Sequence, residues 1–94
     1  MPTIEFDPEK SDRNAKAHGL PFERAAEFEW ETAFVVADVR RSYGGHRLVA
    51  TGYLEERLHV MCFIRIPDGI RVISLRKANS REIRAYEKTT ATDG

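Results

Sequence analysis

The alternation of apolar and polar residues predicts β-strands over the middle and later parts of the chain. The four predicted strands span residues 33–39, 46–53, 58–65 and 70–75. Each is rich in β-branched and aromatic residues. A turn with two glycines at residues 40–45 and a Pro-Asp-Gly turn at residues 67–69 connect strands closely, which favours antiparallel neighbours. Residues 3–6 are expected to add at most one edge strand.

Helix signals stand on both sides of these strands. Asp7 and Pro8 are typical of a helix start and Gly19 of a helix end, so a helix is predicted over residues 8–18. A four-residue apolar repeat from residue 22 to residue 30 predicts a second helix, with Trp30 in the core.

The C-terminal part of the chain carries one more helix signal. Asn79 and Glu82 have the spacing of a capping box, which predicts a helix that ends near Lys88. The expected fold is therefore α+β, with two N-terminal helices, an antiparallel sheet of about four strands and a C-terminal helix.

Length and composition limit the protein to one small domain. We expect residues 1–94 to form a single domain, with residues 89–94 frayed. The one cysteine, Cys62, excludes a disulfide within the chain and a zinc site of several cysteines, and its apolar neighbours predict a buried thiol. The chain shows no secretory leader and no apolar stretch of roughly 20 residues, so we expect a cytoplasmic protein without a membrane partner.

The charges are unevenly distributed although the net charge is zero. Residues 1–39 hold four Lys/Arg against nine Asp/Glu, a net charge of −5, and residues 40–94 hold eleven against six, a net charge of +5. A basic half can present a surface that binds phosphate groups. Alternatively, the two halves neutralise each other in the fold.

Residues 70–87 carry the densest candidate chemistry. Their cations are Arg71, Arg76, Lys77, Arg81 and Arg84. Cations ahead of a helix N-terminus suit a phosphate, and Tyr86 can stack on a base or donate a hydrogen bond. The alternative is a solvated basic helix whose cations pair with Glu82 and Glu87.

A second polar surface is predicted on the first helix. Lys10, Asn14 and His18 recur every four residues and share one face, which is either part of an RNA-binding or catalytic surface or a solvated stripe. The three histidines are too scattered to indicate a metal site, and no hydrolase triad or phosphate loop occurs, so we expect no metal and no cofactor. RNA cleavage without a metal needs only a base, an acid and cations around the phosphate.

The order of these motifs resembles the BrnT family over nearly the whole chain. The matching residues are Phe6-Asp7-Pro8-Glu9-Lys10, Asn14, His18-Gly19, Phe22-Glu23-Arg24-Ala25, Arg47, Gly52, Arg71-Val72-Ile73-Ser74-Leu75-Arg76-Lys77-Ala78, Glu82 and Tyr86-Glu87. Two positions depart from the family pattern. Ala17 stands where the family has a lysine, and Lys16 lies about 100° away around the helix. Pro21 replaces the usual capping serine.

The resemblance implies a fold similar to RelE and a ribonuclease toxin of a type II toxin–antitoxin pair that inhibits translation. It also implies a ribbon-helix-helix antitoxin as the protein partner and binding to operator DNA only through the toxin–antitoxin complex. A non-catalytic module with the same fold, which binds RNA or a protein partner, is the alternative.

The site residues are predicted from their chemistry. The predicted catalytic residues are Arg71, Arg76 and Lys77 on the scissile phosphate, Glu82 or His18 as base, and Tyr86 or His18 as acid. The predicted RNA-binding residues are Lys10, Asn14, Arg47, Arg81 and Arg84, with Arg47 also a possible fourth phosphate cation. If these positions fail, His59 and the opposite face of the sheet are the next place to search.

Overall fold

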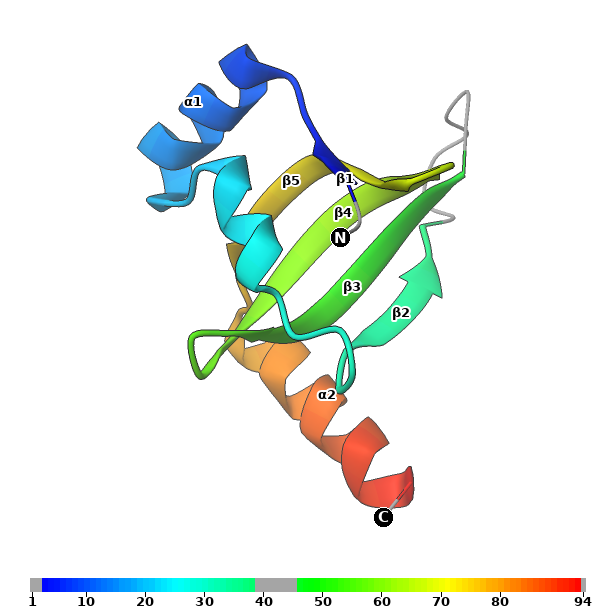
Figure 1. Cartoon of the computed structure of the whole chain (residues 1–94). Coiled ribbons are helices and arrows are strands. Elements are labelled where there is room, and N and C mark those ends of the chain that lie inside the picture. Colours follow the sequence, from blue (N-terminus) through cyan, green and yellow to red (C-terminus); the bar gives the residue numbers. More distant parts are fainter. Residues whose placement is uncertain (1–2, 39–45, 94) are drawn as a thin grey trace.

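The computed structural model describes residues 3–38 and 46–93 (Figure 1). Its elements are β1 (Thr3–Glu5), α1 (Pro8–His18), the 3-10 helix η1 (Phe22–Glu27), β2 (Phe34–Ala37), β3 (Arg47–Leu54), β4 (Arg57–Ile66), β5 (Gly69–Lys77) and α2 (Ser80–Asp93). The predicted turn at residues 40–45 lies outside the described residues. The prediction of four strands between residues 33 and 75 is confirmed within a few residues at each end.

The sheet corrects the predicted fold. Its strand order is β1-β5-β4-β3-β2, and β1 pairs with β5 in parallel, so the sheet has five strands and is mixed. The prediction of an antiparallel sheet of four strands was therefore wrong. The backbone of Thr3 comes so close to β5 that a Cβ on Gly69 would lie 1.9 Å from the Thr3 carbonyl oxygen. Glycine thus permits the pairing, which local patterns could not indicate because it joins distant segments.

The N-terminal region holds one α-helix and not two. The second predicted helix is the short 3-10 helix η1, and the chain is extended at Phe28 directly after it. Phe22 and Ala25 are buried, and their three-residue spacing is that of a 3-10 helix. Trp30 is 41 % exposed, so its prediction as a core residue was also wrong, although its ring packs edge-on against Phe28 and Phe63.

The local end signals of the α-helices are confirmed. Asp7 Oδ1 accepts a hydrogen bond from the Glu9 amide at 2.9 Å, and Gly19 has a φ of 72°. Asn79 and Glu82 form a reciprocal capping box at the start of α2. The helix α2 continues past the predicted end to Asp93.

The sheet packs against helices on both faces. Residues from the α1–η1 region, such as Phe22 and Phe28, form the main core with the strands on one face, which we call the η1 face. On the other face, which we call the α2 face, Tyr86 packs with Leu58 and Val60 at one end of the sheet. Cys62 lies on the α2 face and is half-buried, which is less than predicted.

Candidate functional site

Asn14 fixes α1 against the part of β5 that β1 leaves unpaired. The strand β1 pairs only with Gly69 to Arg71, so the outer edge of β5 is free of strand partners further along. The Asn14 side-chain amide donates hydrogen bonds to the carbonyl oxygens of Leu75 and Leu20, both at 2.7 Å. The residue predicted to bind RNA therefore joins α1, β5 and the segment before η1.

A cavity of about 390 Å³ opens beside α1 at this edge of β5. It is lined by Lys10, Arg13, Asn14, Ala17, His18, Phe22, Arg47 and Ile73. Four of the predicted site residues thus meet in one place. Arg47 comes from β3 and the other three from α1, so only the fold brings them together.

A β-bulge shapes this edge. Cys62 pairs with Ser74 but the next residue, Phe63, pairs with Val72, so Ile73 is the extra residue on β5 and lines the cavity. A bulge shifts the alternation of side chains beyond it. As a result Arg76 lies opposite Val60 on the α2 face, whereas Lys77 lies opposite His59 on the η1 face.

A second cavity, of about 430 Å³, shares the lining residue His18 with the first. Its lining residues are His18, Gly19, Leu20, Arg24, Leu54, Glu55, Arg57, His59 and Lys77. Since His18 lines both cavities, we treat them as one surface and call it the His18 groove. It contains five predicted site residues, namely Lys10, Asn14, His18, Arg47 and Lys77.

His59 also lines the groove. The sequence suggested it only as the next candidate if the predicted site residues failed. Its side chain is 3 % exposed, and its Nδ1 lies 2.7 Å from the carbonyl oxygen of Arg57. A carbonyl only accepts, so Nδ1 carries the hydrogen and Nε2 holds the lone pair. Burial lowers the pKa of His59 and nearby cations add to the effect, which keeps the ring neutral.

The Nε2 atom of His59 is open to the cavity. Among the described residues, no buried side-chain nitrogen or oxygen lacks a hydrogen-bond partner, and Nε2 has no such partner. It therefore reaches solvent on the side that lines the groove. The alternation of His59 with Leu58 and Val60 along β4 is the signal that would have placed it on this face.

The charges of the groove are mostly positive. Arg24 is paired with the carboxylates of Glu27 and Glu55, which raise the pKa of its guanidinium, so its charge is largely offset. Lys77 is exposed, and the structure gives it no ion-pair partner among the described residues. Lys77 and Arg57 therefore face one end of the groove as available cations.

The other predicted catalytic residues lie outside the groove. Arg76 makes two hydrogen bonds of 2.8 Å to the carboxylate of Glu82, which also accepts from the Asn79 amide. The Tyr86 hydroxyl donates to the Thr32 carbonyl oxygen at 2.8 Å, and its ring is buried. These contacts orient Arg76 and anchor α2.

Besides Arg76, four predicted cations lie on the α2 face or on α2 itself. Arg71 is paired with Glu5 of β1. In the strand register, Arg47 and Arg71 flank Ile64 in one row of the α2 face, so the Arg47 side chain starts from that face and also lines the His18 groove. Arg81 and Arg84 are exposed on α2. The structure therefore divides the predicted site between the His18 groove and the α2 face.

Neither a metal site nor a membrane-spanning helix is found among the described residues. No three His, Cys, Asp or Glu side chains in residues 3–38 and 46–93 are grouped so that they could hold a metal ion. No described helix has the length and apolar character to cross a membrane.

A known protein family matches most of the chain. A family model described as the ribonuclease toxin BrnT of type II toxin–antitoxin systems matches residues 6–82. No curated protein matches the chain in sequence. The family match covers α1, the whole His18 groove, Arg71, Arg76 and Glu82.

Proposed function

Because the chain belongs to the BrnT ribonuclease toxins of type II toxin–antitoxin systems, we propose that it stops translation by cutting RNA in the His18 groove. The observation that carries the proposal is the convergence of cations and two histidines in one groove. A polyanion requires cations along its path, and strand scission requires groups that move protons. Another cavity, of about 600 Å³, is mainly apolar, and its lining holds one cation, Arg65, and no histidine.

The proposed reaction uses the RNA itself as the nucleophile and needs no metal. The 2′-oxygen attacks the neighbouring phosphorus, the bond from phosphorus to the 5′-oxygen breaks, and the products are a 2′,3′-cyclic phosphate and a 5′-hydroxyl. His59 Nε2 takes the proton from the 2′-hydroxyl, since it holds a lone pair and is neutral. We propose that His18 donates a proton to the departing 5′-oxygen.

Cations stabilise the charge that develops on the phosphate. Lys77 lies in the cavity that holds both histidines, and Arg47 and Lys10 lie in the adjoining one. We propose that Lys77 contacts the scissile phosphate and that Arg47 and Lys10 hold neighbouring phosphates. Electrostatic contacts of this kind often contribute a factor of ~10²–10³ in rate.

The remaining predicted residues extend this site. We propose that Arg71 and Arg76 bind phosphates of the RNA backbone on the α2 face. Arg81 and Arg84 bind further phosphates along α2. Glu82 and Tyr86 remain candidates for base and acid, although their contacts favour the orientation of Arg76 and the anchoring of α2.

Four single substitutions test the site: His59→Gln, His18→Gln, Lys77→Gln and Arg47→Gln. Each protein is added to a translation extract, mRNA ends are mapped, and thermal melting verifies folding. We expect at least ~10² slower cleavage for His59→Gln and Lys77→Gln. His46→Gln is the control, because His46 is exposed and lies outside the groove. The site is refuted if the groove variants are folded and cut RNA at the wild-type rate. If the wild-type protein binds RNA but leaves it intact, the chain is a non-catalytic binding module.

The partner follows from the type of system. We propose that the antitoxin is a ribbon-helix-helix protein and that the pair represses its own operator through the DNA-binding half. Induction of the chain alone should arrest bacterial growth, and co-expression of the neighbouring gene should restore it. Normal growth in the presence of soluble, folded protein would contradict an active toxin.

A further inference from the structure

The exposed apolar residues of the protein are concentrated in one short segment. Among the described residues, the large hydrophobic side chains that are exposed are Trp30 at 41 %, Phe34 at 44 %, Val35 at 37 % and Val36 at 44 %. We call these four residues the apolar belt. Exposed apolar residues that gather in one part of a surface are typical of a region that a partner covers.

Three residues of the belt, Phe34, Val35 and Val36, lie on the edge strand of the sheet, and Trp30 precedes it. The strand β2 is last in the strand order, and all four of its residues are exposed (Figure 1). Val35 pairs with Ala50 and lies on the η1 face, whereas Phe34 and Val36 lie on the α2 face. An apolar edge strand without a strand partner is a surface that natural proteins usually protect.

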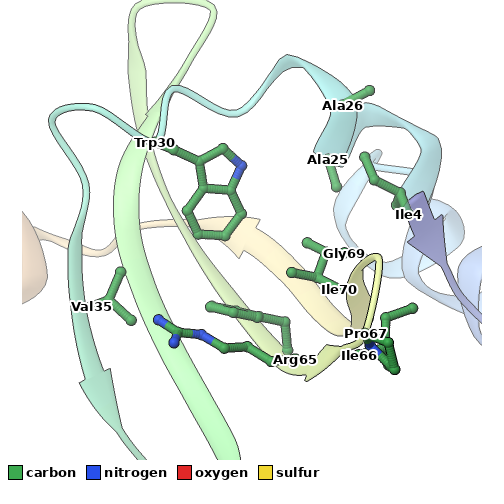
Figure 2. Close-up of a pocket in the computed structure, with 11 residues that line it drawn as sticks. Ile4, Ala25, Ala26, Trp30, Val35, Arg65, Ile66, Pro67, Gly69 and Ile70 are labelled. Carbon is green, nitrogen blue, oxygen red and sulfur yellow. The ribbon is translucent and has the colours of Figure 1, made fainter. Parts of the chain in front are cut away.

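A cavity of about 600 Å³ adjoins the belt on the η1 face. Trp30 and Val35 form its wall on the β2 side, and Ile70 and Ala25 contribute to the rest (Figure 2). Phe63 also lines it. The cavity shares no lining residue with the His18 groove. It is therefore a separate site that the proposed RNA chemistry does not use.

Arg65 supplies the one charge of this cavity. Among the described residues that line it, Arg65 alone is charged, and in Figure 2 its side chain extends toward the β2 side, where Val35 lies. Arg65 is exposed and has no ion-pair partner within residues 3–38 and 46–93. An apolar cavity with one exposed guanidinium is complementary to a partner segment that carries apolar side chains and one carboxylate.

We propose that the protein antitoxin docks here, with a segment that places apolar side chains in the cavity and a carboxylate on Arg65. The proposal rests on the toxin–antitoxin part of the proposed function and not on the ribonuclease site. RNA is an unsuitable occupant because an apolar cavity with one cation does not compensate a row of phosphates. A small molecule would leave Phe34 and Val36 on the other face of β2 exposed, whereas a protein segment can cover the edge as well.

Trp30 gives a direct optical test. It is the only tryptophan of the chain and lines the cavity. The probe is the protein encoded beside this gene, with any tryptophan of its own replaced by phenylalanine. Its addition should shift Trp30 emission to shorter wavelength and reduce quenching by acrylamide. A complex that forms on gel filtration while Trp30 emission and quenching stay unchanged would overturn the proposal.

Matched substitutions locate the contact. Val35→Asp and Val36→Asp make the same change on adjacent residues of similar exposure, but only Val35 faces the cavity. We expect Val35→Asp to weaken antitoxin binding at least about tenfold, because a carboxylate there is desolvated and meets apolar side chains, and Val36→Asp to weaken it less. Arg65→Glu should also weaken binding by about tenfold or more, whereas Arg65→Lys keeps the cation and should largely restore it.

The binding and cleavage readouts keep the two proposals separate. Isothermal titration gives the Kd of each variant whether or not the chain cuts RNA, and thermal melting shows which variants fold. Folded Val35→Asp that still arrests growth but escapes neutralisation supports the docking site. The proposal is overturned if Val35→Asp and Val36→Asp lose equal affinity for the antitoxin, or if Arg65→Glu binds it with wild-type affinity. It is also overturned if Trp30 emission depends on the concentration of the toxin alone.

Discussion

Asn14→Asp is the substitution whose effect follows most directly from the structure. The two side chains have nearly the same shape, but the aspartate has no amide hydrogens. In the native protein both amide hydrogens are used, in bonds of 2.7 Å to the carbonyl oxygens of Leu20 and Leu75. The change therefore removes the link between α1 and the unpaired edge of β5 and places a carboxylate against two carbonyl oxygens.

The cost can be worked out from these contacts. Two lost hydrogen bonds contribute about 2 kcal/mol, and the unsatisfied, partly buried carbonyl groups with the facing carboxylate add about 1–3 kcal/mol. A domain of this length has a free energy of unfolding of about 5–14 kcal/mol. A loss of about 3–5 kcal/mol is therefore a large fraction of the total, and it lowers Tm by at least about 12 °C.

Urea unfolding at pH 7.5, followed by circular dichroism, measures the loss. Asn79→Asp is the matched control, because the Asn79 side chain accepts a hydrogen bond from the Glu82 amide and an aspartate can do the same. A carboxylate at the N-terminus of α2 is also favourable, so the control should stay within about 0.5 kcal/mol of the wild type. The reasoning is refuted if Asn14→Asp unfolds at the wild-type urea concentration, or if the control loses as much.

Three other substitutions test separate parts of the structure. Burial holds the pKa of His59 below its ordinary value of 6.5. The stability that the neutral ring contributes is therefore complete above pH 6.5 and is lost as the pH falls below that value. Urea titrations at pH 7.5 and 5.5 should show that the free energy of unfolding falls less between the two pH values in His59→Gln than in the wild type. Gly52→Ala would place a Cβ 2.7 Å from Phe28 Cζ, and urea unfolding should show a loss of about 1–3 kcal/mol, so an unchanged midpoint would contradict this packing. Tyr86→Phe removes the bond to the Thr32 carbonyl and should cost about 1 kcal/mol with the cleavage rate of the folded protein retained; a folded variant that no longer cuts RNA would instead identify Tyr86 as the acid.

Features that depend on neighbouring residues were predictable from the sequence. The caps at Asp7 and Asn79 and the end at Gly19 were predicted correctly because a side chain or glycine acts on its own backbone. The four strands from β2 to β5 followed from apolar, β-branched stretches and short turns. The ordered family motifs indicated the BrnT family, which the match over residues 6–82 confirms.

The tertiary structure alone decided how these pieces meet. The parallel pairing of β1 with β5 joins segments whose separation in sequence no local pattern spans. The extra residue Ile73 reverses the alternation along β5, so Arg76 shares a face with Arg71 while Lys77 turns to His59. The His18 groove likewise depends on the packing of α1 against the outer edge of β5, since its residues come from segments that are far apart in the chain. Register and packing are set by contacts between distant residues. For that reason the sequence indicated the four strands, the helix caps and the family, but neither the 3-10 form of η1 nor the composition of the site.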